Sequence, residues 1–188
     1  MKKTLVGLAA LLASLGVFAQ GSMIFGNTPA TLGNSTGAPV GFLGDLRPGA
    51  PAGGNVARVS GNTFLSQLIV AGVPVAGTIQ PFRTGGAIGF ITSTTVSFAG
   101  VSAGSTVQTQ LAAWVADLGA DYATALAKNL GGTGISNSVG VTLVEPNNPA
   151  QPAMVGLNGF NIAAVIPEPS LASLGLLGAA VLFLRRKK

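Results

Sequence analysis

Short stretches of alternating polar and apolar residues, separated by turn residues, fill the middle of the chain. Every second residue from Thr92 to Phe98 falls on one side of an extended backbone, which leaves three hydroxyl side chains on the other side. Within Thr106–Trp114, Gln108 and Gln110 alternate in the same way with less polar neighbours. A period of two indicates β-strands with one wet face. Together with short apolar runs separated by Gly, Pro and Asn, this pattern predicts strands at Ser22–Asn27, Ala57–Val59, Phe64–Val70, Ile88–Phe98, Thr106–Trp114, Ser138–Val144 and Gly156–Ile162.

One short helix is predicted in the connection between the strand that ends at Trp114 and the strand that follows it. Asp121 is a favourable N-cap, and the residues from Tyr122 to Asn129 are rich in Ala and Leu. Gly131 and Gly132 come directly afterwards and end the helix.

Residues 20–166 are long enough for one domain with its own core. Their short apolar runs, separated by Gly, Pro and Asn, predict an all-β body. The expected architecture is a two-layer β-sandwich with jelly-roll-like connections and the one loop helix. Asn27–Gly54 and Glu145–Pro152 are rich in proline and are predicted to be loops.

The N-terminal end has the pattern of a secretory signal peptide over residues 1–19. Lys2 and Lys3 form a positive region, and Leu5–Phe18 is an apolar run. Val17 and Ala19 are small residues at the positions that signal peptidase reads, so cleavage is predicted after Ala19. The expected partners at this stage are the Sec translocon and signal peptidase.

The C-terminal end combines an apolar run with a basic terminus. The run Leu171–Leu184 carries no charge, and the four residues after it are all cationic: Arg185, Arg186, Lys187 and Lys188. As a helix, Ser170–Leu184 is about 22 Å long, which is short for a bilayer core of about 30 Å. It crosses if the membrane thins and the arginines reach the headgroups. The terminal cations favour the cytoplasmic face, which places the rest of the chain outside.

Pro167, Glu168 and Pro169 stand directly before this run. Each proline biases the residue before it toward extended geometry. Glu168 is therefore expected in a stiff, extended segment, which suits a protease cleft that binds its substrate as a strand.

The order of Pro-Glu-Pro, short apolar helix and basic terminus resembles the PEP-CTERM sorting signal of Gram-negative bacteria. The resemblance covers residues 167–188 and implies processing near Pro167, Glu168 and Pro169 by exosortase, a membrane protease or transpeptidase. It also implies release of the cargo or its transfer to the outer surface. The alternative is a plain C-terminal membrane anchor that nothing processes. Features of the body such as Tyr122–Ala125 resemble ectodomains of the same class, which supports a sandwich and implies no activity.

The two ends also account for most of the formal charge of +5, because they hold six of the ten Lys and Arg residues. Between residues 20 and 166, four cations stand against four acids: Arg47, Arg58, Arg83, Lys128, Asp45, Asp117, Asp121 and Glu145. A nearly neutral body lacks the basic stripe that nucleic-acid binding requires. The chain holds no Cys and no His, which excludes disulfides, thiol catalysis and histidine zinc sites. No metal and no cofactor are predicted.

Asp117 and Asp121 lie near Trp114 and Tyr122, a combination of carboxylates and aromatic rings that sugar sites use. The favoured interpretation is structural: Asp121 caps the helix, Asp117 belongs to a turn, and the aromatic rings pack in the sandwich. Trp114 and Tyr122 are kept as candidate ligand-contacting residues, and no catalytic residue is assigned.

These observations predict an exported, non-catalytic surface or extracellular-matrix protein, associated with extracellular polysaccharide. It is expected first in the inner membrane with its C-terminus cytoplasmic, and then at the outer surface or outside the cell. One alternative is a carbohydrate-binding module on a permanent C-terminal membrane anchor. A secreted hydrolase is disfavoured by the few scattered acids and the absence of His and Cys.

Overall fold

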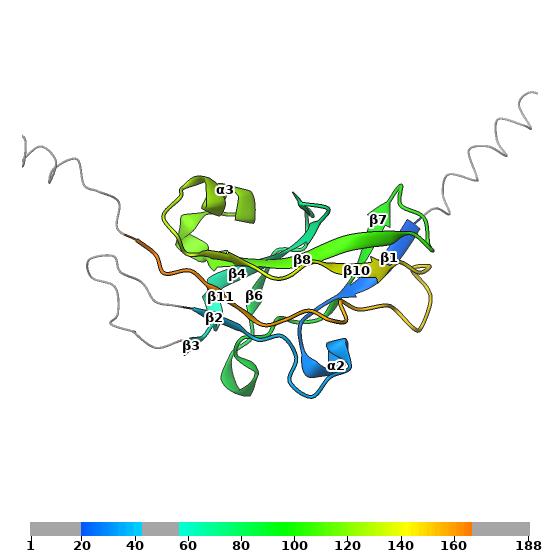
Figure 1. Ribbon diagram of the computed structural model, residues 1–188, viewed down its shortest axis with the longest axis horizontal. Coiled ribbons are helices and arrows are strands. Elements are labelled where there is room, and N and C mark those ends of the chain that lie inside the picture. The colour runs from blue at the N-terminus through cyan, green and yellow to red at the C-terminus, as the bar shows by residue number, and fades with distance from the viewer. Residues whose placement is uncertain (1–19, 43–56, 167–188) are drawn as a thin grey trace, which may run out of the picture.

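The computed structural model describes residues 20–42 and 57–166 (Figure 1). Most of their regular structure is β-strand, arranged in three sheets, and the helices are few and short. The expected all-β class is therefore confirmed for this part of the chain.

Two long antiparallel strands form the centre of the largest sheet. β4 (Gly61–Val70) pairs with β8 (Thr106–Val115) in a register that places Leu68 opposite Leu111. Both strands were predicted, β8 from its alternation and β4 from its short apolar run, and both extend slightly beyond the predicted bounds. The shorter strands that pair antiparallel with β4 or β8 are β5 (Val73–Pro74), β6 (Gln80–Phe82), β9 (Thr133–Ile135) and β10 (Val139–Thr142).

The two faces of this sheet have different roles. Leu68 and Leu111 are fully buried and point into the core. The residues next to them along the strands, Gln67 and Ala112, are also opposite each other and point to the other face, together with Trp114. That second face carries the helix α3 (Tyr122–Ala127), because Tyr122 contacts both Trp114 and Gln67.

Two smaller sheets complete the body. They contain β1 (Gln20–Phe25) antiparallel to β7 (Thr94–Ala99), and β2 (Val40–Phe42) between the parallel β11 (Phe160–Ile162) and the antiparallel β3 (Ala57–Arg58). Ser22 and Val144 exchange backbone hydrogen bonds of 2.7 and 3.2 Å, which join β1 to the chain after β10. The N–H of Ala163 donates to Thr133 O at 3.0 Å and joins the β11 segment to β9.

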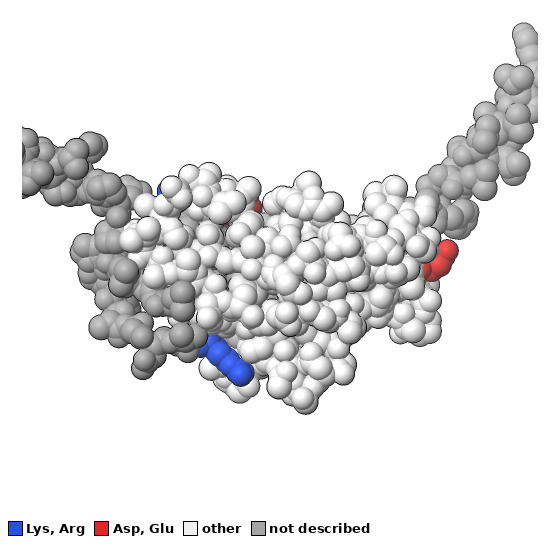
Figure 2. All heavy atoms as spheres, viewed as in Figure 1, with Lys and Arg blue, Asp and Glu red and all other residues white. Residues whose placement is uncertain are grey.

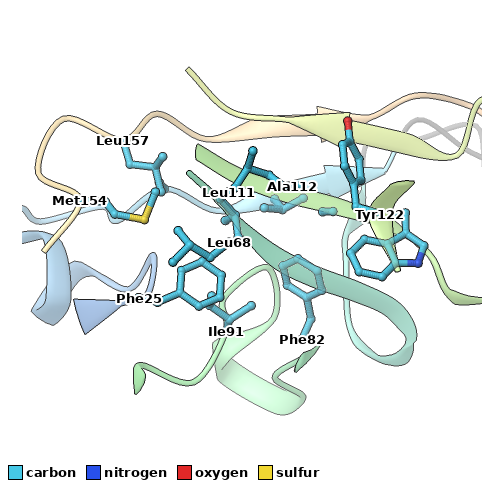
Figure 3. Packing of buried hydrophobic residues seen from close by; sticks show 14 of the residues in the cluster. Phe25, Leu68, Phe82, Ile91, Leu111, Ala112, Tyr122, Met154 and Leu157 are labelled. Atoms are coloured by element: carbon cyan, nitrogen blue, oxygen red, sulfur yellow. The ribbon is translucent and has the colours of Figure 1, made fainter. Parts of the chain in front are cut away.

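The core draws on every part of the described chain. Figure 3 shows Phe25, Leu68 and Ile91 close together, with Met154 and Leu157 from a late loop beside them. These five side chains are at most 3% exposed. Among the described residues, every buried side-chain nitrogen or oxygen has a hydrogen-bond partner. The body is thus a packed unit in which buried polar groups are satisfied, as stable folds require.

The predicted helix is present as α3 (Tyr122–Ala127), which follows the 3-10 turn η2 (Ala116–Leu118). Asp121 is its N-cap, as expected, because its side chain accepts a hydrogen bond from Thr124 N. The helix is shorter than predicted. Asn129, the last predicted residue, has a φ of 53° and has left the right-handed helical region.

The stretch Asn27–Gly54, predicted to be a loop, contains regular structure. The four-residue helix α2 (Pro29–Leu32) and the strand β2 both lie in it. Thr28 caps α2 by accepting from Thr31 N, and Gly33 ends it with a φ of 66°. A Thr-Pro start and a Gly end are standard helix signals that the prediction overlooked.

The predicted strand Ile88–Phe98 is wrong in its first half. The chain forms the 3-10 turn η1 (Gly85–Ala87), Ile91 makes an isolated bridge, and the strand β7 starts only at Thr94. Gly89 has a φ of 83°, which breaks the extended conformation. Four further predicted strands are present with bounds that differ by a few residues. The strands predicted at Ser22–Asn27, Ala57–Val59, Ser138–Val144 and Gly156–Ile162 are β1, β3, β10 and β11.

The described chain begins and ends at opposite ends of its long axis (Figure 1). Gln20 starts β1 at one end, and Ile166 follows β11 at the other. In the part of the chain that the structure describes, no helix has the length and apolar character needed to span a membrane. The predicted signal peptide and C-terminal helix lie outside the described residues.

Candidate functional site

A pocket of about 300 Å³ opens on the outer face of the large sheet, beside α3. The β4–β5 hairpin forms one wall, α3 forms the opposite wall, and β8 and β9 form the floor. The side chains that line it are Ile69, Pro74, Gln110, Tyr122, Ala123, Leu126 and Ile135. Most of these groups are apolar, as in many binding pockets.

Gln67 holds two walls of the pocket in place. Its Oε1 accepts a hydrogen bond from Tyr122 N at 3.2 Å, and its Nε2 donates to Val75 O at 3.2 Å. The side chain is only 3% exposed. One buried carboxamide therefore ties both the start of α3 and the segment after β5 to the middle of β4.

Trp114, one of the two candidate ligand-contacting residues, is fully buried. Its Nε1 donates to Gly119 O at 2.9 Å, so the polar atom of the indole is already paired. Trp114 therefore offers no ring face to a ligand, and the structure supports the favoured interpretation that this aromatic residue packs in the fold.

Tyr122, the other candidate, lines the pocket and is 9% exposed. Its ring lies 6.1 Å from the Trp114 ring, centroid to centroid, at an angle of 55°. Figure 3 shows its hydroxyl pointing away from the core residues Phe25 and Ile91. Burial raises the pKa of the Tyr122 phenol above its usual value. Tyr122 thus contributes an edge of the pocket and no open stacking platform.

The acids near this site have structural contacts. Asp121 Oδ1 accepts from Thr124 N at 2.7 Å, and this hydrogen bond lowers the pKa of the Asp121 carboxyl. Asp117 is exposed, and its backbone oxygen accepts from Lys128 Nζ at 3.2 Å. Among the described residues no three His, Cys, Asp or Glu side chains gather as a metal site would require.

The polar groups of the pocket are few. Gln110 Nε2 donates to Ser136 O at 3.0 Å, which leaves its carbonyl oxygen for other partners. Leu126 and Ile135 are 54% and 40% exposed and form an apolar rim. A pocket with this lining suits an apolar group with one hydrogen-bond donor better than a polyhydroxylated sugar, whose hydroxyls need many partners.

Sequence reasoning found Tyr122 but missed Gln67, Gln110 and Ile135 as parts of one site. Gln67 carried a signal, because it is a single amide in the otherwise largely apolar run Phe64–Val70. Ile135 carried none, since it comes to the pocket only through the pairing of β9 with β8.

The predicted processing residues lie outside the described parts of the chain. They are Ala19 at the signal cleavage site, the motif Pro167, Glu168 and Pro169, and the basic tail Arg185, Arg186, Lys187 and Lys188. The first and last described residues are both on the surface of the body: Gln20 is exposed, and Ile166 is 52% exposed.

Comparison with known proteins adds no relative: no family model, no curated protein and no solved structure matches this chain.

Proposed function

We propose that this chain is an exported, non-catalytic surface or extracellular-matrix protein that an exosortase-type enzyme sorts through residues 167–188. The observation that carries the proposal is the order of Pro167-Glu168-Pro169, an uncharged apolar run and four terminal cations. The N-terminal pattern of residues 1–19 supplies the export that such sorting requires.

The exit of the chain from the folded body supports this use of the tail. The N–H of Ile166 donates to Leu130 O at 2.7 Å, so the backbone is held up to the residue before the motif. The Ile166 side chain is 52% exposed, which places this exit on the surface. The described chain therefore reaches the surface at the residue directly before the motif that the enzyme would recognise.

The contacts of the acids favour a non-catalytic body. Asp121 is occupied as a helix cap, and Glu145 is an exposed residue at the start of a proline-rich turn. General acid–base catalysis on sugars uses a pair of carboxyl groups that flank the substrate. The pocket lining contains no carboxylate.

The finer architecture belongs to the same proposal: a two-layer β-sandwich with jelly-roll-like connections. It is supported by the large sheet, which buries the face that carries Leu68 and Leu111, and by the packing of β1 and Ile91 against that face.

Expression with and without an exosortase tests the sorting step. In a Gram-negative host that has the enzyme, we expect the protein in the outer-surface or medium fraction. In the same host without it, we expect the protein in the inner-membrane fraction. Glu168→Ala should keep the protein in the inner membrane even when the enzyme is present. Glu145→Ala changes the other Glu-Pro pair of the chain, is exposed, and should be sorted as the wild type is.

The second candidate, a carbohydrate-binding module on a permanent C-terminal membrane anchor, would have to use the pocket next to Tyr122, whose apolar lining disfavours a sugar. This candidate predicts that the full-length protein binds a glycan array and that Leu126→Asp at the pocket rim abolishes binding. Val155→Asp is a matched control, because Val155 is 66% exposed and does not line the pocket. Absence of binding by the wild type would eliminate this candidate and leave the sorting proposal unaffected.

A further inference from the structure

β7 forms the edge of its sheet. Within residues 20–42 and 57–166 it pairs with β1 alone, in a register that places Ser97 opposite Ser22 and Val96 opposite Met23. Thr95 and Ser97 are exposed, whereas Val96 and Phe98 are half-buried against the core. The strand therefore has a packed face, a wet face and one unpaired edge.

The hydrogen bonds of β1 show which residues of β7 face that edge. The N–H groups of Ser22 and Ile24 donate to the backbone oxygens of Val144 and Pro152, and therefore point away from β7. The residues between them must therefore bond to β7, and their partners include Val96. Because backbone groups alternate in direction along a strand, the N–H and C=O groups of Thr95 and Ser97 point outward from the sheet.

This edge lacks the features that usually protect a strand from further pairing. Natural proteins place Lys, Pro or an inward-pointing charge on such edges, or shorten them to a few residues. β7 has six residues, and no charged residue and no proline occur anywhere between Arg83 and Asp117. Its sequence, Thr-Thr-Val-Ser-Phe-Ala, is of the type that favours strands.

We propose that β7 pairs antiparallel with β7 of a second copy of this chain, with Ser97 opposite Ser97 of the other copy. In this register the outward groups of Thr95, Ser97 and Ala99 form the hydrogen-bonded pairs. Val96 then lies opposite Phe98 of the other copy on the half-buried face, twice by symmetry. Pairs of an aromatic with a β-branched side chain are among the stabilising cross-strand pairs.

The charges of the body favour a second copy as the partner. The described residues contain three cations and three acids: Arg58, Arg83, Lys128, Asp117, Asp121 and Glu145. The described parts of two copies thus carry no net charge that would repel them, and Figure 2 shows a face that is nearly free of charged side chains. A symmetric, isologous pair also uses the same surface on both copies, and here that surface is the free edge of β7.

The position of β7 allows this pairing before and after sorting. β7 lies with β1 at one end of the body, and the chain leaves toward the sorting segment at the other end (Figure 1). The edge is therefore remote from the exit at Ile166. This pairing does not depend on exosortase, so it goes beyond the proposed function.

Single cysteines in the full-length chain, which has none of its own, test the contact. Residues in a hydrogen-bonded antiparallel pair have Cα atoms about 5.5 Å apart, within the range of a disulfide. Membranes that contain Ser97→Cys, treated with copper–phenanthroline, should give a disulfide-linked dimer on a non-reducing gel. Ala127→Cys, exposed in α3, is the control and should remain monomeric. Equal cross-linking of both variants, or capture of a different protein by Ser97→Cys, would overturn the proposal.

A charge exchange at the same position separates pairing from folding. Ser97→Lys places two cations opposite each other, and Ser97→Glu places two anions there, so each variant alone should associate about fivefold more weakly than the wild type. A mixture of the two differently tagged variants should recover association in a pull-down, because the opposed charges then attract. The same exchange at Ala127 should have no effect. If the mixture associates no better than either variant alone, β7 does not pair in this way.

Discussion

The ring of Tyr122 packs against the ring of Trp114, with 6.1 Å between the ring centroids. Trp114 is further fixed by its bond to Gly119 O, and the N–H of Tyr122 is fixed by Gln67 Oε1. Together these contacts attach α3 to the outer face of the large sheet. The two aromatic residues that suggest a sugar site in the sequence thus have a shared role in packing.

Burial raises the pKa of Tyr122 above its usual value of 10.0. A raised folded-state pKa contributes stability that is fully present below pH 10.0 and is lost as the pH rises through the folded value. We expect the tyrosinate absorbance of the folded protein to rise at a higher pH than that of the unfolded protein. Tyr122 is the one tyrosine in the chain, so the signal is unambiguous. Titration at the unfolded pKa would contradict the burial of this phenol.

The Asp121 cap should make the start of α3 sensitive to acid. Its hydrogen bond from Thr124 N holds the pKa of the carboxyl below its usual value of 3.8. The stabilising effect is therefore present above pH 3.8 and is lost as the pH falls through the lower, folded value. Asp121→Asn keeps an acceptor and should remove this part of the acid dependence, measured as the midpoint of urea unfolding against pH.

A buried asparagine connects three segments of the core. Asn27 Nδ2 donates to Ala38 O at 2.8 Å and Gly89 O at 3.0 Å, and its Oδ1 accepts from Ile91 N at 2.8 Å. Asn27→Ala leaves Ala38 O and Ile91 N without these partners, while Gly89 O keeps its bond from Val40 N, and should lower the free energy of unfolding by about 2 kcal/mol or more. Urea denaturation measures this loss. The exposed Asn62→Ala should stay within about 0.5 kcal/mol of the wild type.

The turn between β4 and β5 offers a stabilising substitution. Ala71 has a φ of 49° and Gly72 a φ of 81°, so both residues are in the left-handed region, as in the turns that favour Asn-Gly. Ala71→Asn or Ala71→Gly should raise the free energy of unfolding by about 0.5–1 kcal/mol. Ala76→Asn, an exposed position with no positive φ, is the control. A loss of stability at Ala71 would contradict this turn geometry.

Local patterns predicted the elements whose geometry depends on neighbouring residues. The alternation within Thr106–Trp114 predicted β8, and the helix signal at Asp121 predicted α3. Both signals depend only on residues that are close together in the sequence. The same kind of local signal at Thr28 and Gly33 predicts α2, and it was overlooked among the prolines of that stretch.

Long-range contacts decided what the sequence did not show. Gly89 turns the chain out of the strand predicted there, and it is held by bonds to Val59 O and from Val40 N. The pocket joins Ile69 to Ile135, which are distant in sequence and meet only because β4 and β9 both pair with β8. Neither relationship has a local signature.

The most direct measurement is the intact mass of the protein recovered from a host that contains exosortase. The account predicts a product that begins at Gln20 and lacks the C-terminal apolar run and basic tail, and it predicts that this shortening disappears in Glu168→Ala. Recovery of a chain that still ends at Lys188, with or without the enzyme, would contradict the sorting role and leave a plain anchor in its place.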